Sequence, residues 1–270
     1  MSGRLVVCAT PIGNLDDVTL RLLAALRTAD VVACEDTRHT LGLLKRHGIT
    51  AKLVSYHEHN EARRATELVA RITAGETVAL VTDAGMPLVC DPGHVLVRDV
   101  VAAGGRVEVL PGPSAVLTAL VASALPADTW RFVGFLPRKA GELRALLLSA
   151  RETLVAFESP HRTAASLAAL AELDRDRPVA LCRELTKLHE EVVRGGAAEL
   201  AERFAGAEPR GEVVLVIGPP PQVAPDLVAA LDALERLVAA GAKVRPAAQV
   251  VAELTGAPAN ALYQGLLGRK

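Results

Sequence analysis

The residues best suited to chemistry stand directly after short apolar runs in the first half of the chain. Thr10-Pro11 follows the first run, Glu35-Asp36 follows the second, and His57-Glu58-His59 follows the third. Longer polar or turn-forming segments, 83–93 and 111–115, follow the fourth and fifth runs. In an open α/β sheet, ligands bind beyond the carboxyl ends of the strands, so these segments are expected to converge at one edge. Helix caps and turns explain some of these residues, but they do not easily explain all five segments together.

Three familiar catalytic or nucleotide-binding motifs are missing from the sequence. No G-x-G-x-x-G follows the first apolar run, and no G-x-x-x-x-G-K-[ST] occurs anywhere. The segment 112–116, with the sequence GPSAV, lacks the final glycine of a G-x-S-x-G nucleophile elbow. These absences argue against a dinucleotide oxidoreductase, a P-loop NTPase and a serine hydrolase.

The histidines and cysteines do not form a recognisable metal site. His57 and His59 are spaced as two possible ligands, but no third ligand stands in register, so polar residues lining a cleft are the favoured interpretation. The cysteines are far apart and include no Cys-x-x-Cys pair; they are Cys8, Cys34, Cys90 and Cys182. We therefore predict neither a metal site nor a disulfide.

The apolar runs themselves have the pattern of buried parallel strands. Each run is short and nearly continuous in Val, Leu or Ala, and a segment with helical periodicity follows it. The strands are predicted at 5–9, 30–34, 52–56, 77–82 and 106–110, and the helices at 19–28, 37–47, 61–73, 94–103 and 114–123. This alternation predicts an open α/β sheet in a first domain over residues 1–123.

The alternation resumes after a break at 124–128 and stops at three consecutive prolines, 219–221. A second α/β domain with a mixed sheet is predicted over residues 129–218. Its strands are expected at 131–135, 153–157, 178–182, 191–194 and 212–217, and its helices at 141–150, 161–172 and 197–204. Beyond the stiff proline run, helices at 226–240, 246–255 and 260–267 indicate a small helix-turn-helix-like tail over residues 224–270.

Composition and charge limit the classes of protein that remain. Half of the 270 residues are apolar, which allows a large core and excludes a disordered chain. No apolar run reaches the roughly 20 residues of a membrane span, and no signal-peptide pattern opens the sequence, so a soluble cytoplasmic protein is expected. The net charge of −1 does not suit a general nucleic-acid coat protein. Residues 131–151 hold five basic residues and one acid, which form either a local basic surface or an ordinary solvated helix face.

Eight short motifs occur in a fixed order along the two predicted domains. They are ATPIGNLDD (9–17), CEDTRH (34–39), SYHEHN (55–60), DAGMPLVCDPG (83–93), PGPSA (111–115), GFLPRK (134–139), FESPHR (157–162) and RELTKLHE (183–190). Together they closely resemble the family of small-subunit (16S) ribosomal RNA cytidine 2′-O-methyltransferases, over roughly residues 4–217. Met86 and Cys90 differ from the commoner Thr and Ser of that family, a mild change that leaves the loop plausible.

The resemblance implies both a fold and a cofactor. The fold is of the tetrapyrrole methylase type, with two α/β domains and the cofactor, S-adenosylmethionine, in the cleft between them. Glycine- and proline-rich turns let the backbone approach such a ligand closely, and a preformed cleft can exclude water. The cofactor contacts that the resemblance implies are Thr10, Pro11, Asp83, Ala84, Gly85, Met86, Ser114, Ala115, Glu158, Ser159, Pro160 and Leu185.

The implied reaction transfers a methyl group to a ribose 2′-hydroxyl. Positioning should supply much of the acceleration, and a general base would help because the hydroxyl is a weak nucleophile. A carboxylate near a cation has a lowered pKa and makes a poor base, so positioning can matter more than proton removal. The expected catalytic residues are Glu35, Asp36, Arg38, Glu58 and Lys187, and the expected substrate contacts are His57, His59, Arg138, Lys139, Arg162 and Arg183. The alternative for Arg38, Arg162, Arg183 and Lys187 is an ion pair with Glu35, Glu158, Glu184 and Glu190, respectively.

Two other functions stay open at this point. A tetrapyrrole or other small-molecule methyltransferase would share the fold, although the EDTRH and YHEHN segments resemble the RNA branch specifically. A non-enzymatic RNA-binding or assembly factor would bind ribosomal subunits without transferring a methyl group. The expected partner is small-subunit ribosomal RNA, either naked or in an assembled subunit, and the resemblance also implies a homodimer. The helical tail either contacts this RNA or serves only as a packing appendage.

Overall fold

The computed structural model describes residues 3–206, 209–221 and 226–269. The chain forms two compact units, one up to Pro220 and one from Pro221 onward. Within the described residues, every predicted strand and helix is present, with bounds within two residues of the expected ones. Residues 1, 2, 207, 208, 224, 225 and 270 of the predicted domains lie outside the described residues. No described helix is long and apolar enough to cross a membrane.

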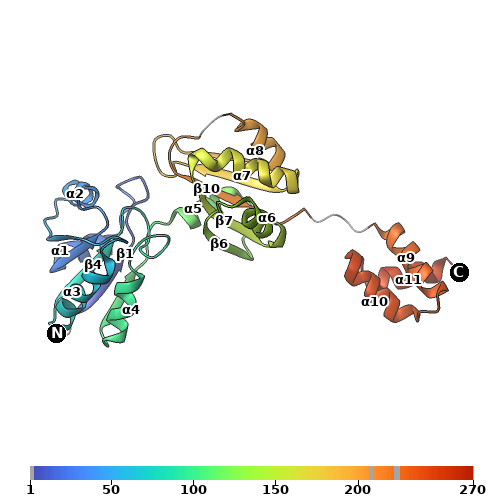
Figure 1. Ribbon diagram of the computed structural model, residues 1–270, viewed down its shortest axis with the longest axis horizontal. Helices are drawn as coiled ribbons and strands as arrows, with labels where there is room; N and C mark the ends of the chain where they lie inside the picture. Colours follow the sequence, from blue (N-terminus) through green and yellow to red (C-terminus); the bar gives the residue numbers. More distant parts are fainter. Residues whose placement is uncertain (1–2, 207–208, 222–225, 270) are drawn as a thin grey trace. The chain divides into compact units, whose positions relative to one another are not determined.

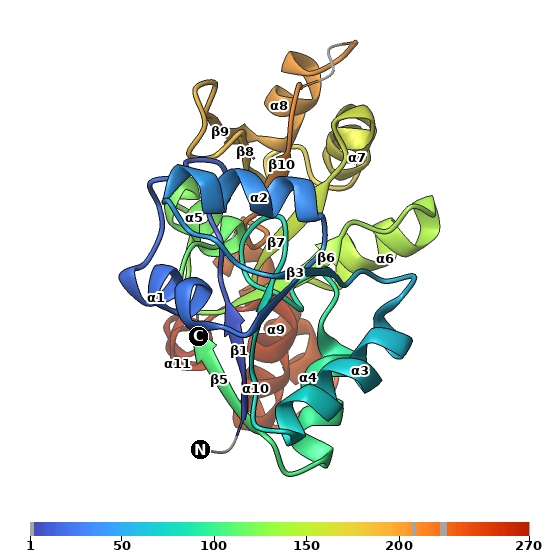
Figure 2. The same cartoon turned by 90° about the vertical axis from the view of Figure 1, so that its left-hand side faces the viewer.

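The first sheet has five parallel strands in the order β3-β2-β4-β1-β5. The strands are β1 (Arg4–Cys8), β2 (Val31–Cys34), β3 (Leu53–Ser55), β4 (Thr77–Val81) and β5 (Arg106–Leu110), and the helices between them are α1 (Leu20–Thr28), α2 (Thr37–Arg46), α3 (Glu61–Thr73) and α4 (His94–Ala102). Alternate residues of each strand face opposite sides, so one side packs on α1 and α2 and the other on α3 and α4. Both faces of the sheet are thereby covered (Figures 1 and 2).

The second sheet is mixed, as its sequence predicts, with the order β6-β7-β10-β8-β9. Its strands are β6 (Trp130–Phe135), β7 (Thr153–Glu158), β8 (Pro178–Arg183), β9 (Glu191–Gly196) and β10 (Val213–Ile217). Only the β6–β7 pair is parallel among the described strands of this sheet. Helices α6 (Ala140–Ser149), α7 (Pro160–Leu173) and α8 (Ala197–Arg203) bury their apolar sides on one face.

The other face of the second sheet is covered by α5 (Ala115–Ser123), which follows the last strand of the first sheet. Val116, Ala119 and Leu120 of α5 pack with buried residues of β7, β8 and β10. The predicted first domain, 1–123, contains this helix in chain order, but by its packing α5 belongs to the second sheet (Figure 1). The start of α5 is therefore a point where the two sheets are joined.

The second compact unit is a bundle of α9 (Leu227–Ala239), α10 (Val244–Thr255) and α11 (Ala259–Gly268) around its own small core. Asp226 caps α9, because its carboxylate accepts the amides of Val228 and Ala229, each at 3.0 Å. Gly256 ends α10 with φ 73°, a left-handed conformation that glycine adopts without strain. The three short helices predicted for the tail are present in this unit.

A buried arginine joins several elements of the second domain. Arg177 is only 3% exposed, and its guanidinium donates to the carbonyls of Gly218 (2.7 Å), Leu147 (3.2 Å) and Ala150 (3.3 Å). Burial lowers the pKa of this guanidinium, which nevertheless stays charged at neutral pH. One side chain thus supplies donors to the carbonyl that follows β10 and to two carbonyls at the C-terminal end of α6, where the helical hydrogen bonding ends.

Replacing Arg177 with methionine should lower the free energy of unfolding by about 3 kcal/mol, because three carbonyl groups lose their donors. Urea unfolding measures this loss. Arg175→Met is the matched control, since Arg175 is exposed and a surface substitution usually changes stability by less than about 0.5 kcal/mol. Equal stability of the two variants would contradict the role of Arg177.

Candidate functional site

The loops that follow β1 and β4 are bound directly to each other. The amide of Thr10 donates to the carbonyl of Gly85 at 2.9 Å, and the amide of Gly85 donates back to Thr10 at 3.1 Å. The Thr10 hydroxyl also donates to the carbonyl of Thr82 at 3.0 Å. Gly85 has φ 75°, so the turn needs a residue that tolerates the left-handed region. The structure therefore brings together Thr10, Pro11 and the segment 83–85, all of which are predicted cofactor contacts.

The loop from Asp83 to Gly93 is held in an uncommon backbone conformation. Leu88 and Cys90 have φ 73° and 67°, although neither is a glycine, and Gly93 has φ 139°. Backbone strain of this kind persists where the surrounding structure enforces it, and it is concentrated at functional sites. The half-buried side chain of Met86, a predicted cofactor contact, packs against the core between the sheet and α3 and α4.

Three carboxyl groups gather where β2 and β4 end. These strands are parallel neighbours, so Glu35 and Asp83 leave the sheet side by side, and the Asp36 amide donates to Asp83 Oδ1 at 3.1 Å. Burial, and then the charge of Asp83, raise the pKa of Glu35. Burial, and then the charge of Glu35, raise the pKa of Asp91 to about 7. We call Glu35, Asp83 and Asp91 the acidic cluster; within it, Asp91 is able to exchange a proton near neutral pH.

Asp36 and Arg38 have a structural role at the start of α2. The Asp36 carboxylate caps α2 by accepting the Arg38 amide at 2.8 Å, and it also binds the Arg38 guanidinium at 3.0 Å. The hydrogen bond from the Arg38 side chain lowers the pKa of Asp36, which makes it a weak base. Of the predicted catalytic residues on this segment, Glu35 has the environment better suited to accepting a proton.

In the segment after β3, the His57 side chain is half-buried, whereas Glu58 and His59 are exposed. His57 Nε2 lies 3.1 Å from Nδ2 of Asn60, and its Nδ1 is enclosed without a hydrogen-bond partner among the described residues. The His59 ring meets the His57 ring edge-on, with the two ring centroids 5.9 Å apart. No group of three or more His, Cys, Asp or Glu within the described ranges could hold a metal ion. His57 Nδ1 is therefore an atom that a ligand could satisfy.

In the second domain, Glu158 and Arg162 form an internal brace. Glu158 is 3% exposed, and its carboxylate accepts from the Ser166 hydroxyl (2.5 Å) and the Ser159 amide (2.8 Å). Arg162 pairs with Glu158 at 3.4 Å and donates to the carbonyls of residues 136 and 137 at 3.1 and 2.8 Å. The guanidinium predicted to bind substrate is thus occupied in holding the end of β6 against the start of α7. Ser159 and Pro160, two predicted cofactor contacts, begin that helix.

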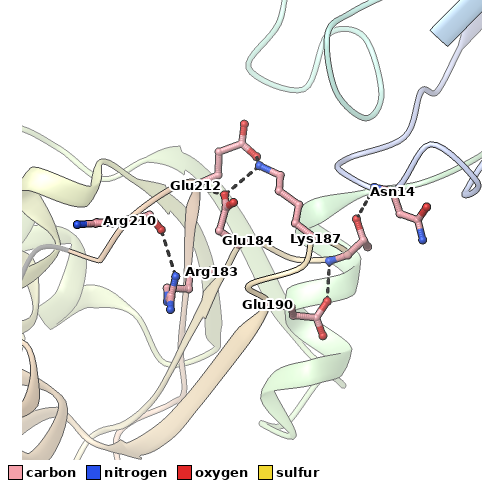
Figure 3. A network of polar contacts seen from close by, with 8 residues as sticks. Asn14, Arg183, Glu184, Lys187, Glu190, Arg210 and Glu212 are labelled. Atoms are coloured by element: carbon pink, nitrogen blue, oxygen red, sulfur yellow. Dashed lines mark hydrogen bonds and ion pairs between the residues drawn. The ribbon is translucent and has the colours of Figure 1, made fainter. Parts of the chain in front are cut away.

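The turn between β8 and β9 contains a network of ion pairs (Figure 3). The Lys187 ammonium donates to Glu184 Oε1 at 2.9 Å and to Glu212 Oε2 at 3.0 Å, and its hydrogen bond lowers the pKa of Glu184. Arg183 pairs with Glu191 at 2.7 Å. Both predicted functional cations therefore have carboxylate partners, but not the expected ones. Arg183 pairs with Glu191 instead of Glu184, and Lys187 pairs with Glu184 and Glu212 instead of Glu190.

The segments after β1 and β8 meet, so loops of both domains lie against each other. The Asn14 amide donates to Thr186 Oγ1 at 3.0 Å, and Ile12 and Leu185 belong to the same buried cluster as α5. Ser114 caps α5, and Ala115 at its first turn is packed against that cluster. The cofactor contacts predicted after β1 and β4 and at residues 114, 115 and 185 are thus linked through a continuous set of loops.

Other residues stand apart from this set or were not predicted from the sequence. Arg138 and Lys139 are exposed before α6, where Lys139 pairs with Glu142 at 2.9 Å; in the described structure neither binds a predicted cofactor residue. Sequence reasoning passed over Asp91 and Glu212. Asp91 belongs to the motif 83–93, one of the eight that carry the family resemblance, so this motif could have indicated it. Glu212 belongs to none of the eight motifs.

Comparison with known proteins gives this arrangement a family. A family model described as Tetrapyrrole (Corrin/Porphyrin) Methylases matches residues 4–201. Ribosomal RNA small subunit methyltransferase I of Mesorhizobium japonicum is 46% identical over 271 residues, covering 98% of this chain and 92% of that protein. The protein of the same name from Mycobacterium tuberculosis (strain H37Rv) is 46% identical over 273 residues, covering 98% and 95%.

Among solved structures, uroporphyrin-III C-methyltransferase from Thermus thermophilus, complexed with S-adenyl homocysteine, is 25% identical. The TM-score is 0.56, over 80% of this chain and 97% of that one. The fold is therefore shared with tetrapyrrole methylases, while the much closer sequence likeness extends over nearly the full chain, including the helical tail. This chain belongs to the ribosomal RNA small subunit methyltransferase I family and has the tetrapyrrole methylase fold.

Proposed function

We propose that this chain transfers a methyl group from S-adenosylmethionine to the ribose 2′-hydroxyl of a cytidine in small-subunit (16S) ribosomal RNA. The observation that carries the proposal is the 46% identity to relatives named as small-subunit ribosomal RNA methyltransferases, over 98% of this chain. A tetrapyrrole substrate has less support, because the solved tetrapyrrole methylase is 25% identical and covers 80% of the chain. A purely RNA-binding role does not explain why the acidic cluster and the strained loops lie at the same sheet edge.

The residues at this edge suit a ligand that carries positive charge and that the backbone can approach closely. S-Adenosylmethionine supplies a methyl group on a cationic sulfur, and it also bears an ammonium group. The carboxyl groups of the acidic cluster complement that charge. Gly85 and Gly112 let the backbone come close, since a Cβ on Gly112 would lie 2.9 Å from Cβ of Ala9. The proposed cofactor contacts are Thr10, Pro11, residues 83–86, Ser114, Ala115, residues 158–160 and Leu185. The Glu158 carboxylate already accepts hydrogen bonds from Ser159 and Ser166, so Glu158 contributes to cofactor binding through its neighbours.

Acid–base catalysis is assigned to the acidic cluster. Asp91 has a pKa of about 7, near the pH at which a general base works best, and Glu35 has a raised pKa for the same reason of burial. His57 Nδ1, enclosed and without a partner in the described structure, is placed to bind the substrate or to pass a proton. Asp36, Arg38, Glu58 and Lys187 are proposed to orient the substrate. Arg138, Lys139 and His59 are exposed and can contact phosphate groups, as can Arg183 at its accessible edge.

The direct test is incubation with S-adenosylmethionine carrying a labelled methyl group and with unmodified small ribosomal subunits or naked 16S RNA. Nuclease mapping should recover the label on the ribose of one cytidine. A tetrapyrrole added in place of RNA serves as the comparison substrate. Label on a tetrapyrrole and none on RNA would overturn the proposal, and binding of subunits without any transfer would favour an assembly factor.

The pH dependence of the rate follows from Asp91. Since a base must be ionised, the single-turnover rate should rise with pH up to about 7 and then level off. Asp91→Asn should remove this rise and lower the rate on the order of a hundredfold at saturating cofactor. A parental rate and pH profile in the Asp91→Asn variant would exclude Asp91 as the base.

The folding stability of the chain gives a second readout for Asp91, and it falls with rising pH where the rate rises. The folded pKa of Asp91 lies above its unfolded value of 3.8, so ionisation opposes folding and the parent loses stability as pH rises from about 4 to 7. Asp91→Asn should therefore gain melting temperature relative to the parent at pH 8 and gain little at pH 4. Asp176→Asn, at an exposed position, is the control that should show neither change.

The homodimer implied by family resemblance is also part of the proposal, as is a cytoplasmic location for an enzyme acting on ribosomal RNA. Val109 on the edge strand β5 is 55% exposed, and Val121 on α5 is 81% exposed, so apolar surface is available for a second copy. Light scattering at micromolar concentration should give the mass of a dimer. A monomer mass would remove the dimer from the proposal.

A further inference from the structure

Two loops from different domains touch through an unusually close backbone contact. The β1 loop (residues 9–19) follows β1, and the β8 loop (residues 184–190) joins β8 to β9. The Asn14 amide donates to Thr186 Oγ1 at 3.0 Å (Figure 3). A Cβ on Gly13 would lie 2.5 Å from Cγ of Lys187 and 3.0 Å from the carbonyl oxygen of Leu185, which no real Cβ could occupy without a shift of its neighbours. The β1 loop therefore rests on the β8 loop through bare backbone.

The β8 loop presents Thr186 in a conformation that its neighbours must hold. Thr186 has φ 67° and Glu184 has φ 51°, and a left-handed backbone is strained for a β-branched residue. The Thr186 amide donates to Glu190 Oε2 at 2.6 Å, and the Lys187 amide donates to the Glu184 carbonyl at 2.9 Å. The ammonium of Lys187 then ties Glu184 to Glu212 (Figure 3). These bonds offset the strain and leave the Thr186 hydroxyl facing the β1 loop.

The β1 loop is fixed to the first domain at residues 10–12, the other end of the short stretch that leads to Asn14. Thr10 forms its pair of backbone hydrogen bonds with Gly85, and Ile12 is 6% exposed in the cluster that contains Leu185 and α5. Residues 10–14 consequently span from the loop after β4 to the β8 loop. Four of the proposed cofactor contacts, Thr10, Pro11, Gly85 and Leu185, lie at the two ends of this span.

We propose that Thr186 is a positioning residue whose hydroxyl, by holding the Asn14 amide, sets the separation of the two sides of the cofactor site. The inference rests on the proposed use of S-adenosylmethionine, and it concerns a residue that does not itself react. Loss of the acceptor lets the β1 loop move and lowers the fraction of molecules whose loops match the cofactor. Cofactor affinity falls as a result, whereas methyl transfer from the bound state is preserved.

The test compares Thr186→Val with Thr186→Ser. Valine has the same shape and the same β-branching, so it keeps the backbone strain and removes only the acceptor, while serine retains the hydroxyl. Calorimetry with S-adenosylhomocysteine should show about fivefold weaker binding for Thr186→Val, the size expected for one hydrogen bond, and near-parental binding for Thr186→Ser. In methyl-transfer assays the valine variant should raise KM for S-adenosylmethionine and keep kcat within about twofold.

A second readout needs no cofactor. Hydrogen exchange at the Asn14 amide should become about fivefold faster in ligand-free Thr186→Val and stay parental in Thr186→Ser. Gly13→Ala pushes the same two loops apart and should also weaken cofactor binding, which keeps the test available if the valine variant does not fold. Unchanged affinity and exchange in a folded Thr186→Val protein would overturn the positioning role alone. Failure of the parent chain to bind S-adenosylhomocysteine would instead overturn the proposed cofactor, and the positioning role with it.

Discussion

The site depends on the parallel pairing of β1 with both β4 and β5. In a parallel ladder every strand ends at the same edge, so the loops after these three strands must leave the sheet together. Beyond the sheet, the two Thr10–Gly85 hydrogen bonds form an antiparallel bridge that joins the loops after β1 and β4. Polar side chains that would be costly inside the covered sheet are thereby placed where water or a ligand can reach them. The acidic cluster lies at the same edge, where burial and neighbouring carboxylates raise the pKa values of Glu35 and Asp91.

The second domain is brought to this edge by α5. Its first residues leave β5 with the proposed cofactor contacts Ser114 and Ala115, and its apolar side then packs on the second sheet. The β8 loop reaches back from that sheet to the β1 loop. Each domain therefore supplies part of the proposed site, and the two parts are connected both through the chain at α5 and through the contact of Asn14 with Thr186.

Periodicity and turn residues were enough to predict the elements and the meeting of the loops, because the first sheet is covered on both faces and its strands are nearly continuous in apolar residues. The partners of single polar side chains were not predictable. Arg162 braces the end of β6, because a residue 25 positions away in sequence lies beside it. Asp91 was missed because left-handed Leu88 and Cys90 turn the loop back toward Glu35, and no local rule predicts that conformation for these residue types.

The proposed function requires one ligand site built from loops of both domains. Hydrogen exchange of the full chain, with and without saturating S-adenosylhomocysteine, tests for such a site most directly. We expect added protection at residues 9–19, 83–93, 111–115 and 184–190, with the outer helices α2, α3 and α8 unchanged. Protection limited to the loops of one domain, or absent from all four segments although the ligand binds, would contradict a site shared between the domains.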